Sequence, residues 1–462
     1  MALLLWFAVA GCVRYVPQPV EPARHAAAYR ARTLDDERLL AWVARWAGRP
    51  ELHRWSDRQL AVAALGTRAE LGRVRADWRA AVAGEGALRA RPAPGLEGGL
   101  ERAVSGSGGQ SPWVVSLAGL FSVELGGKRG ARVQRARARS AVAEAELRLT
   151  AWRTVGAVRS AALAVVAAEA DLGSSRREVE SLVGVQALER ARYEEASLTS
   201  GELARTGSEV QDARARASAA EAAVLETRAA LAGVLAVPQV AVDSLEVTAV
   251  AGVGCAALDS VTSDSMAALA LTQRPEVGRA LAEYAVAEAD LRLEVARQYP
   301  DLELGPGFIW DQGVHRWTLG LALPNLLGFR NRAAIDAAEV LRTAAAAHVA
   351  EVQDELLAEL TLGTGRCRGA ALERASSEAQ VAAAREGAEL ARVAYERGET
   401  SRLDPALVDL AVVRAERARQ TAELRLASAG RALDAALGAW AGGGGERWPD
   451  PRDDALTEGA PR

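Results

Sequence analysis

The chain has 462 residues, of which 50% are hydrophobic but only 5% are aromatic, and its formal net charge is -4 at pH 7. This weak negative charge excludes the basic field that is typical of nucleic-acid-binding proteins. The three cysteines Cys12, Cys255 and Cys367 are far apart, so we expect no disulfide framework. No apolar run reaches the ~18 residues of a membrane-spanning helix.

The N-terminus, residues 1–12, has the short apolar run of a secretory signal peptide. It ends in Val9-Ala10-Gly11-Cys12, which resembles a bacterial lipobox. In such a motif the cysteine becomes the lipidated first residue of the mature protein, so we expect lipidation at Cys12. The alternative is a buried helical start with a structural cysteine. The proline-containing segment 13–33 is expected to be extended.

Residues 34–238 are predicted to form one unit: a helical stretch, a β-hairpin at about 94–125, a long helix and a return helix. Apolar and small side chains alternate in the second strand, as in a strand with one apolar face. The glycine-rich loop between the strands indicates a hairpin tip and not a phosphate site, because no helix opens after it. The long helix begins near Lys128 and would reach on the order of 100 Å. It breaks near Tyr193–Leu203.

Residues 239–262 are expected to form an irregular connector, and the same order of elements then recurs over 263–440, with a hairpin at about 300–325. Lys128 matches Arg330 and Tyr193 matches Tyr395, each pair being separated by 202 positions in the sequence. This offset predicts two structural repeats. The tail, residues 441–462, is rich in glycine, proline and charge and is predicted to be disordered.

The predicted fold is therefore mainly α with a small β part, and each chain contributes four strands of a length suited to a membrane β-barrel. Four strands cannot close a barrel, and lipid does not tolerate an open sheet edge, so several chains are required. The long helices would continue the pore into the adjacent aqueous compartment. The side chains expected to face lipid are Trp113, Phe121, Phe308, Trp317, Leu319 and Leu321.

Three segments resemble the TolC-type outer membrane efflux proteins. They are RPEVGRALAEYAVAEADLRLEVARQYPDLEL (Arg274–Leu304), ELGGKRGAR (Glu124–Arg132) and YERGETSRLDPAL (Tyr395–Leu407). The resemblance covers roughly residues 55–440, and Cys12 is similar to the cysteine of the lipoprotein branch. It implies a homotrimer in which long coiled-coil helices form an α-barrel continuous with a 12-stranded transmembrane β-barrel. The helical barrel is expected to close at its periplasmic end.

The resemblance assigns the closed end to the two helical turns that contain Tyr193 and Tyr395. Nine residues after each tyrosine lies a carboxylate, Glu202 in the first turn and Asp404 in the second. A trimer would thus carry six carboxylates around a narrow mouth, which favours cations. The candidate partners for closing salt bridges are Arg397 and Arg402.

Helix capping is an alternative role for the same carboxylates, and the two roles are compatible. Asp404 followed by Pro405 fits an N-cap and the first helical position. The first turn departs from the family pattern, because Ala196 stands where the tip glycine is expected.

The sequence has no catalytic triad, Walker loop or zinc-binding spacing, so we expect neither an enzyme nor a cofactor or metal site. The main hypothesis is a passive exit duct in the cell outer membrane, serving a tripartite RND-type drug or heavy-metal efflux pump. Its expected partners are a periplasmic adaptor, an inner-membrane pump and outer membrane lipid, with no nucleic acid. The alternatives are the outlet of a type I protein-secretion system and, in another class, a soluble periplasmic coiled-coil scaffold.

Overall fold

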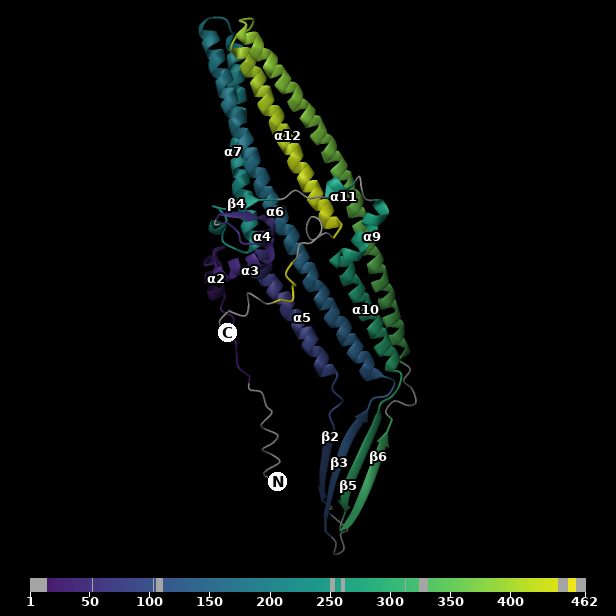
Figure 1. The fold of residues 1–462 in the computed structure, drawn as a ribbon. Coiled ribbons are helices and arrows are strands. Elements are labelled where there is room, and N and C mark those ends of the chain that lie inside the picture. Colours follow the sequence, from purple (N-terminus) through teal and green to yellow (C-terminus); the bar gives the residue numbers. More distant parts are fainter. Residues whose placement is uncertain are drawn as a thin grey trace.

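The computed structural model describes residues 15–51, 53–102, 104, 111–249, 254–258, 262–311, 313–323, 331–438 and 448–453. The chain is elongated, with a small β-sheet at one end and the tips of long helices at the other (Figure 1). A group of short helices and strands lies at the waist of the molecule, between the sheet and the tips (Figure 1). The structure is mainly helical, which confirms the predicted fold class at this level.

The first part of the chain forms several short elements before the sheet: α2 (Pro22–Arg30), α3 (Glu37–Ala47), β1 (Arg54–Ser56), α4 (Asp57–Thr67) and α5 (Ala69–Leu88). The Asp36 carboxylate caps α3 by accepting from two backbone amides, and Ser56 forms a capping box with Gln59 at the start of α4. The prediction of an extended segment over 13–33 is wrong for α2, because Pro22 starts a helix that an alanine run continues.

The connector between the two halves of the chain is more ordered than expected. It contains η1 (Gln239–Ala241), β4 (Glu246–Thr248) and α8 (Gly254–Ala257). Strand β4 pairs with β1 in parallel, and Val247 lies opposite Trp55. The next helical stretch divides into α9 (Ser263–Gln273) and α10 (Pro275–Ala296), because proline cannot continue a helix but suits its first position. We call the described residues of 22–67 and 239–273 the belt.

A large apolar core joins the belt to the long helices. Trp55 and Leu60 of the belt, Leu147 and Val158 of the first long helix, and Leu231 of its return helix are fully buried in one cluster. Burying such side chains stabilises the fold by about 1.5–3 kcal/mol each. This core fixes the belt mainly to the first half of the chain.

The four long strands form one antiparallel sheet in the order β2-β3-β5-β6. The two hairpins are joined by the pairing of β3 with β5, and within the described residues the outer edges of β2 and β6 have no partner strand. The strands are β2 (Gly95–Arg102), β3 (Trp113–Val123), β5 (Leu302–Asp311) and β6 (Val314–Ala322).

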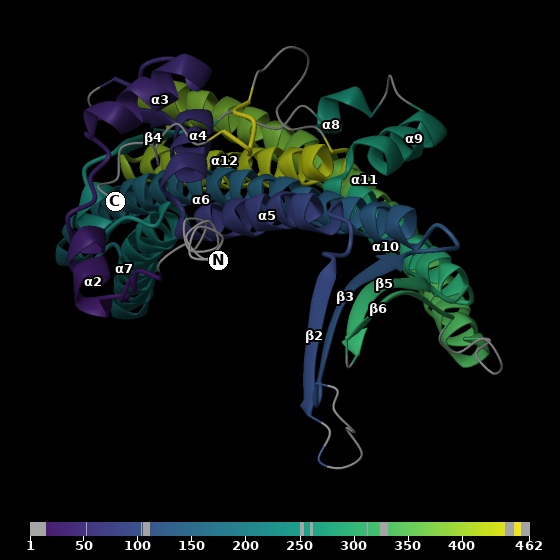
Figure 2. The same cartoon turned by 90° about the horizontal axis from the view of Figure 1, so that it is seen from below.

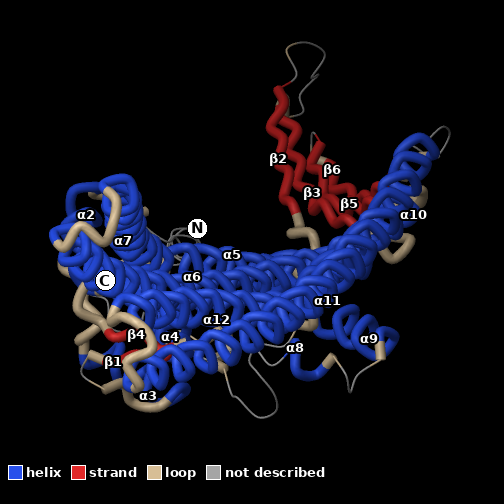
Figure 3. Tube along the Cα trace, turned by 90° about the horizontal axis from the view of Figure 1, so that it is seen from above, coloured by secondary structure: helices blue, strands red, loops and turns tan. Residues whose placement is uncertain are grey.

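Two long helical hairpins continue from the sheet: α6 (Lys128–Glu194) with α7 (Ser200–Leu235), and α11 (Arg332–Glu396) with α12 (Leu403–Ala436). With 67 residues, α6 is about 100 Å long. The second hairpin packs on the first through α12 and α6. Viewed along the molecule, α3, α8 and α9 lie on one side of the long helices and the sheet extends towards the other (Figures 2 and 3).

The junction between β3 and α6 depends on two consecutive glycines. Gly126 and Gly127 both have left-handed backbones, with φ of 69° and 75°. A Cβ on Gly126 would lie 2.5 Å from Cδ2 of Tyr299 and 2.9 Å from the backbone oxygen of Ala296. Next to them, the Lys128 ammonium lies 2.8 Å from the Asp301 carboxylate. The GGK part of the ELGGKRGAR motif therefore forms a tight elbow between sheet and helix.

A disulfide joins Cys255 of α8 to Cys367 of α11. This bond was not predicted from the cysteine spacing, because 112 positions separate the two residues. Around it lies a small apolar cluster that includes Met266, Leu360 and Leu433. The disulfide thus fixes the belt to the second helical hairpin, where the apolar core is small.

The C-terminal segment 448–453 packs on the waist of the molecule. Trp448 lies against the large core, and the Arg58 guanidinium is 5.8 Å from the centre of its ring. Arg75 donates a hydrogen bond of 2.9 Å to the carbonyl of Pro451. The prediction of a disordered tail is therefore wrong for residues 448–453, while 439–447 and 454–462 lie outside the described residues.

Candidate functional site

The sheet places its aromatic side chains and most of its leucines on one face. The register aligns Phe121 with Leu304 and Leu304 with Leu321, and Phe308 pairs directly with Trp317. Residues aligned across a sheet point to the same side. The same face therefore carries all six side chains predicted to meet lipid: Trp113, Phe121, Phe308, Trp317, Leu319 and Leu321.

Five of these six side chains are exposed within a single chain, and Phe308 is half-buried. Trp317 is 83% exposed, and Leu319 and Leu321 of the same strand are 74% and 64% exposed. An exposed apolar patch of this kind indicates contact with a membrane or another protein. The opposite face is mixed, because it carries small and acidic residues (Glu97, Gly99, Ser116, Ala118, Glu303, Gly307, Thr318 and Gly320) together with Val114, Leu120, Ile309, Val314 and Arg316.

The first helical tip joins α6 to α7 through a fully hydrogen-bonded turn. The amides of Ala196 and Ser197 donate to the carbonyls of Tyr193 and Arg192, each at 2.9 Å. This pattern is a Schellman motif, whose left-handed position usually holds glycine. Here the position is Ala196, with φ of 57°. The first turn therefore keeps the standard geometry without the standard glycine.

The return helix α7 then begins with a capping box. Glu202 accepts hydrogen bonds from the Thr199 amide at 2.9 Å and from the Thr199 hydroxyl at 2.7 Å. The Glu202 amide in turn donates to the Thr199 hydroxyl oxygen at 3.3 Å. The exposed carboxylate of Glu202 thus closes the first turn of its own helix.

The second tip has the same design, with the expected glycine. The amides of Gly398 and Glu399 donate to the carbonyls of Tyr395 and Ala394, each at 2.9 Å, and Gly398 has φ of 74°. The Asp404 carboxylate accepts from the Ser401 amide at 3.0 Å and from its hydroxyl at 2.8 Å.

The prediction that Asp404 is the N-cap of the return helix is wrong in detail. Helix α12 already begins at Leu403, which is buried against the first hairpin. Asp404 therefore lies in the first turn and caps backwards onto Ser401. Pro405, one residue later, is still within the turn in which proline is tolerated.

Hydrogen bonding lowers the pKa of both tip carboxylates. The hydroxyl and amide of Thr199 hold the pKa of Glu202 below its usual value, with smaller contributions from nearby arginines. The hydroxyl and amide of Ser401 lower the pKa of Asp404 in the same way, and the charge of Arg192 lowers it further. The tips therefore present fixed negative charges.

The other predicted gate residues make no ion pair with these carboxylates among the described residues. Arg397 and Arg402 are exposed, and among the described residues neither guanidinium lies within 4 Å of a carboxylate. Tyr193 and Tyr395 are 44% and 43% exposed. The contact between the two tips is instead made by Arg192, which the sequence did not indicate and which approaches the Ser401 hydroxyl at 3.5 Å.

We expect the two tip turns to respond oppositely to exchanging glycine and alanine. Ala196→Gly relieves a left-handed alanine and should raise the free energy of unfolding by about 0.5–1 kcal/mol. Gly398→Ala introduces the same strain and should lower the free energy of unfolding by about 1 kcal/mol. Thermal unfolding followed by circular dichroism checks both variants. Equal shifts of the same sign would contradict the assignment of Ala196 as the strained position.

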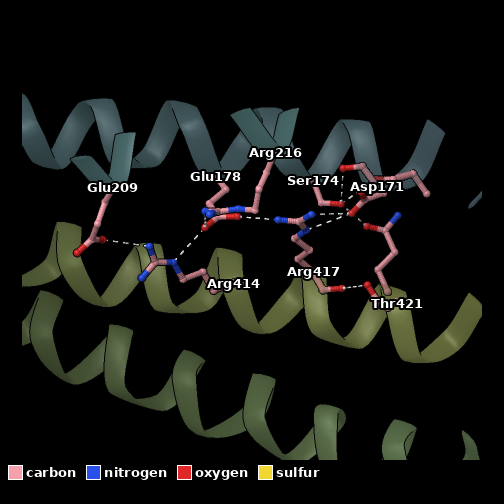
Figure 4. Close-up of polar contacts among 10 residues, drawn as sticks. Asp171, Ser174, Glu178, Glu209, Arg216, Arg414, Arg417 and Thr421 are labelled. Carbon is pink, nitrogen blue, oxygen red and sulfur yellow. Dashed lines mark hydrogen bonds and ion pairs between the residues drawn. The ribbon is translucent and has the colours of Figure 1, made fainter. Parts of the chain in front are cut away.

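An ionic cluster around one buried carboxylate joins the two helical hairpins (Figure 4). Glu178 of α6, whose side chain is 6% exposed, accepts hydrogen bonds from Arg216 of α7 and from Arg414 and Arg417 of α12, at 2.9, 3.2 and 2.9 Å. Three helices thus meet on one carboxylate.

Two more carboxylates complete this cluster. Arg417 also binds Asp171 of α6 at 2.9 Å, and Arg414 also binds Glu209 of α7 at 3.3 Å. The three carboxylates balance the three guanidinium groups, so the cluster is neutral as a whole, with Glu178 as its buried centre. Burial raises the pKa of Glu178, but the guanidinium groups lower it more, so the net shift is downward and the carboxylate stays ionised. We call these six residues the ionic cluster.

A second buried ionic contact lies at the belt. The Asp57 side chain of α4 is 1% exposed and lies 3.0 Å from the Arg159 guanidinium of α6. Its carboxylate also pairs with Arg431 of α12, which is 9% exposed. Asp57 thus connects the belt to both long hairpins. The spacing of charges in the sequence revealed neither of these buried contacts.

Over the described residues, no helix is long and apolar enough to cross a membrane. In that same part of the chain, no group of three or more histidine, cysteine, aspartate or glutamate side chains is arranged to hold a metal ion. Cys12, the predicted lipidation site, lies outside the described residues.

The sequence matches the profile of one protein family, described as outer membrane efflux protein, over residues 60–237 and 266–439. Among curated protein sequences, none matches significantly. Several solved structures have the same fold. The outer-membrane channel OprN has a TM-score of 0.66 and 19% identity, over 93% of this chain and 99% of OprN.

The outer membrane protein VceC from Vibrio cholerae has a TM-score of 0.66 and 19% identity, over 84% of this chain and 96% of VceC. A membrane protein from Pseudomonas aeruginosa has a TM-score of 0.64 and 22% identity, over 82% of this chain and 93% of that one. At these identities the structural similarity establishes the fold.

Proposed function

Because the chain belongs to the outer membrane efflux protein family, we propose that it is a passive exit duct through the outer membrane, serving a tripartite RND-type drug or heavy-metal efflux pump. The observation that carries the proposal is the four-stranded sheet, which has one apolar face and two free edges and leads directly into α6 and towards α11. A sheet of this kind suits a membrane, whereas a soluble coiled-coil scaffold has no use for it.

The duct is a homotrimer in this proposal. Both free edges, on β2 and β6, must pair before the sheet can enter lipid, because unpaired backbone groups are costly there. Three copies of the four-stranded sheet supply the twelve strands of a closed barrel, with the apolar face outward. The two halves of each chain, α4–α7 and α9–α12, have the same order of elements and act as two repeats around the wall.

Transport energy comes from an inner-membrane pump, to which a periplasmic adaptor connects the tips. An outlet for type I secretion has the same architecture and remains the alternative within this class. The family consists of channels, and no enzymatic step is assigned to the chain.

Fractionation tests the proposal. We expect the full-length protein in the outer membrane fraction, extracted by detergent as a trimer and forming channels in planar bilayers. Recovery in the soluble periplasmic fraction without detergent contradicts the duct and favours the scaffold. The single-channel conductance of purified trimer completes the test.

A lipid on Cys12 fits the distance between belt and membrane. Cys12 precedes Pro22, the first residue of α2, by ten positions. An extended segment of that length spans about 34 Å. Helix α5, with 20 residues, spans about 30 Å and runs from the belt to the sheet (Figure 1). A tether of this length allows Cys12 to reach the membrane surface beside the sheet.

Labelled palmitate tests this anchor. We expect incorporation in the wild type and none after Cys12→Ser, while the barrel keeps the protein in the membrane. Palmitate that persists after Cys12→Ser contradicts the assignment of this cysteine.

The tip carboxylates are proposed to set the ion preference and the closure of the periplasmic mouth. Replacing both Glu202 and Asp404 by alanine removes six negative charges from a trimer, so single-channel conductance should rise and the preference for cations should fall. The same change removes two helix caps. The control is therefore Thr199→Ala with Ser401→Ala, which removes the hydroxyl hydrogen bonds of both caps and keeps the carboxylates and the backbone amides that donate to them.

The two double variants separate the two roles in planar bilayers. A gate requires the carboxylate variant to change conductance and ion selectivity much more than the control does. Equal effects of both variants assign Glu202 and Asp404 to capping alone.

A further inference from the structure

The Cys255–Cys367 disulfide lies where the belt packs on the second helical hairpin. Cys367 of α11 is 1% exposed, and Cys255 of α8 is half-buried. The side chains packed with them are apolar, and they come from three helices: Met266 and Ala270 of α9, Leu360 of α11, and Leu433 of α12. The bond is thus enclosed by an apolar layer between the belt and the hairpin.

Helix α8 depends on this bond for its position. It has only four residues, Gly254–Ala257, and a helix of one turn is not stable alone. It packs on α11 and α12. The junction of α9 and α10 is held separately, because Arg274 binds Glu359 of α11 at 3.0 Å and the Ala435 carbonyl of α12 at 2.9 Å. Without the bond, α9 and α10 therefore stay attached while α8 is released.

We propose that this chain is a substrate of a thiol oxidant in the periplasm, and that the oxidant acts before α8 packs against α11. The inference rests on the proposed function, because it requires export to a compartment in which disulfides form. The thiolate of one cysteine attacks the disulfide of the oxidant and forms a mixed disulfide. The thiolate of the other cysteine then displaces the oxidant, which leaves as a dithiol and takes up the two electrons and two protons that the chain loses.

The surroundings of the two sulfurs place oxidation before packing. Both steps of the exchange need a thiolate, and an apolar surrounding disfavours that charged form. A protein oxidant must also reach a sulfur, whereas Cys367 is enclosed once α8 is in place. Earlier in folding, before α8 packs on α11, both thiols are in water. The same enclosure later shields the finished bond from reductants.

Lipidation of Cys12 leaves a single possible pair. The three cysteines allow three different disulfides in one chain, and only one of these joins α8 to α11. The thioether of a lipid-modified cysteine takes no part in disulfide exchange, because the exchange needs a thiolate. The proposed lipid on Cys12 thus protects the pairing of the other two cysteines in addition to anchoring the chain.

Thiol counting in cells tests the oxidation step. The full-length chain is made in a bacterial host with and without its periplasmic thiol oxidase, and the cells are quenched with acid. A maleimide that carries a long polymer then shifts the protein on a gel once for each free thiol. We expect no shift in the complete host and two shifted thiols in the deficient host, where cystine added to the medium should restore the bond. A fully oxidised chain in the deficient host without cystine overturns the need for the oxidant.

Two variants control the count. Cys367→Ser should show one free thiol in both hosts, because Cys255 then has no partner. Cys12→Ser should leave the wild-type count unchanged, because a lipid-modified Cys12 contributes no thiol. A disulfide between Cys12 and Cys255 in the Cys367→Ser protein contradicts the protection by the lipid.

The order of bond formation and packing is tested on the purified protein. Dithiothreitol should reduce the bond at least about tenfold more slowly in the folded protein than in urea. In the Cys255→Ser protein, amide hydrogen exchange should rise in α8 and stay unchanged in α10, where Arg274 keeps its contacts. Equal rates of reduction in the folded and unfolded protein show that the bond stays accessible after packing, and they overturn the proposed order.

The location of the protein keeps the two proposals apart. Oxidised protein in the soluble periplasmic fraction contradicts the duct and leaves the oxidation step standing. Protein in the outer membrane that carries two free thiols overturns the oxidation step and leaves the duct standing.

Discussion

Asp57→Asn should be among the most destabilising single changes in this chain. The substitution keeps the size of the side chain and removes the negative charge that neutralises Arg159 and Arg431 at the belt. Losing one partner of a buried ion pair costs about 3–5 kcal/mol. Because Asp57 joins α4 to both α6 and α12, the loss should loosen the belt from both hairpins. Thermal unfolding of the detergent-solubilised protein, followed by circular dichroism at the helix band, measures the effect.

The matched control is Asp77→Asn. Asp77 pairs with Arg73 at 2.7 Å, but its side chain is 60% exposed, so its loss should cost less than about 1 kcal/mol. Similar unfolding temperatures for the two variants would show that the buried contact at Asp57 contributes little to stability.

Gly126→Ala should disrupt the elbow between the sheet and α6. The added methyl group would overlap Tyr299 and the backbone oxygen of Ala296, and the left-handed backbone disfavours alanine in addition. We expect a loss of about 3–5 kcal/mol, the sum of overpacking and backbone strain. The yield of folded, detergent-stable protein and its unfolding temperature measure this loss.

Gly127→Ala separates the two causes. Gly127 has a similar backbone, with φ of 75°, but a Cβ there meets no atom within 4 Å. This variant should show the strain alone, about 1–2 kcal/mol. Tyr299→Ala should recover part of the loss in Gly126→Ala and none in Gly127→Ala. Equal losses for the two glycine variants would exclude steric overlap as the cause.

The strands and the long helices were predictable from the sequence, because each depends on the periodicity of apolar residues within a short stretch of chain. Alternation from Trp317 to Leu323 placed β6 and its apolar face, and the register of the sheet follows from it. The long helices and both tips were placed within a few residues, because glycine, proline and capping residues mark those breaks.

Contacts between distant segments were not predictable in this way. Glu178 and Arg417 are 239 positions apart, and their meeting depends on how α12 packs on α6. The same holds for the parallel pairing of β1 with β4 and for the Cys255–Cys367 disulfide. The helices of this chain carry many charged residues. The periodicity of the sequence alone does not show which of these residues become buried in the folded chain.

At the tips, the structure shows the capping role of the predicted carboxylates, and their role in a gate stays a prediction. The spacing of Glu202 and Asp404 from the two tyrosines located both carboxylates, and capping was one of the two roles expected. The first turn departs from the family pattern by having alanine in place of the tip glycine. The structure shows what this means for the backbone, because Ala196 adopts the left-handed conformation that Gly398 adopts in the second turn.

The Cys255–Cys367 bond, which spans 112 positions of the 462-residue chain, gives about a quarter of the chain a closed topology. It makes a covalent ring that contains α9, α10, β5, β6 and the first half of α11, whereas β2 and β3 belong to the open chain. A single cut after Asp311 in this ring leaves one covalent molecule until the disulfide is reduced. Tension applied to β5 or β6 is therefore transmitted to the belt along both arms of the ring, and the two hairpins of one sheet are mechanically unequal.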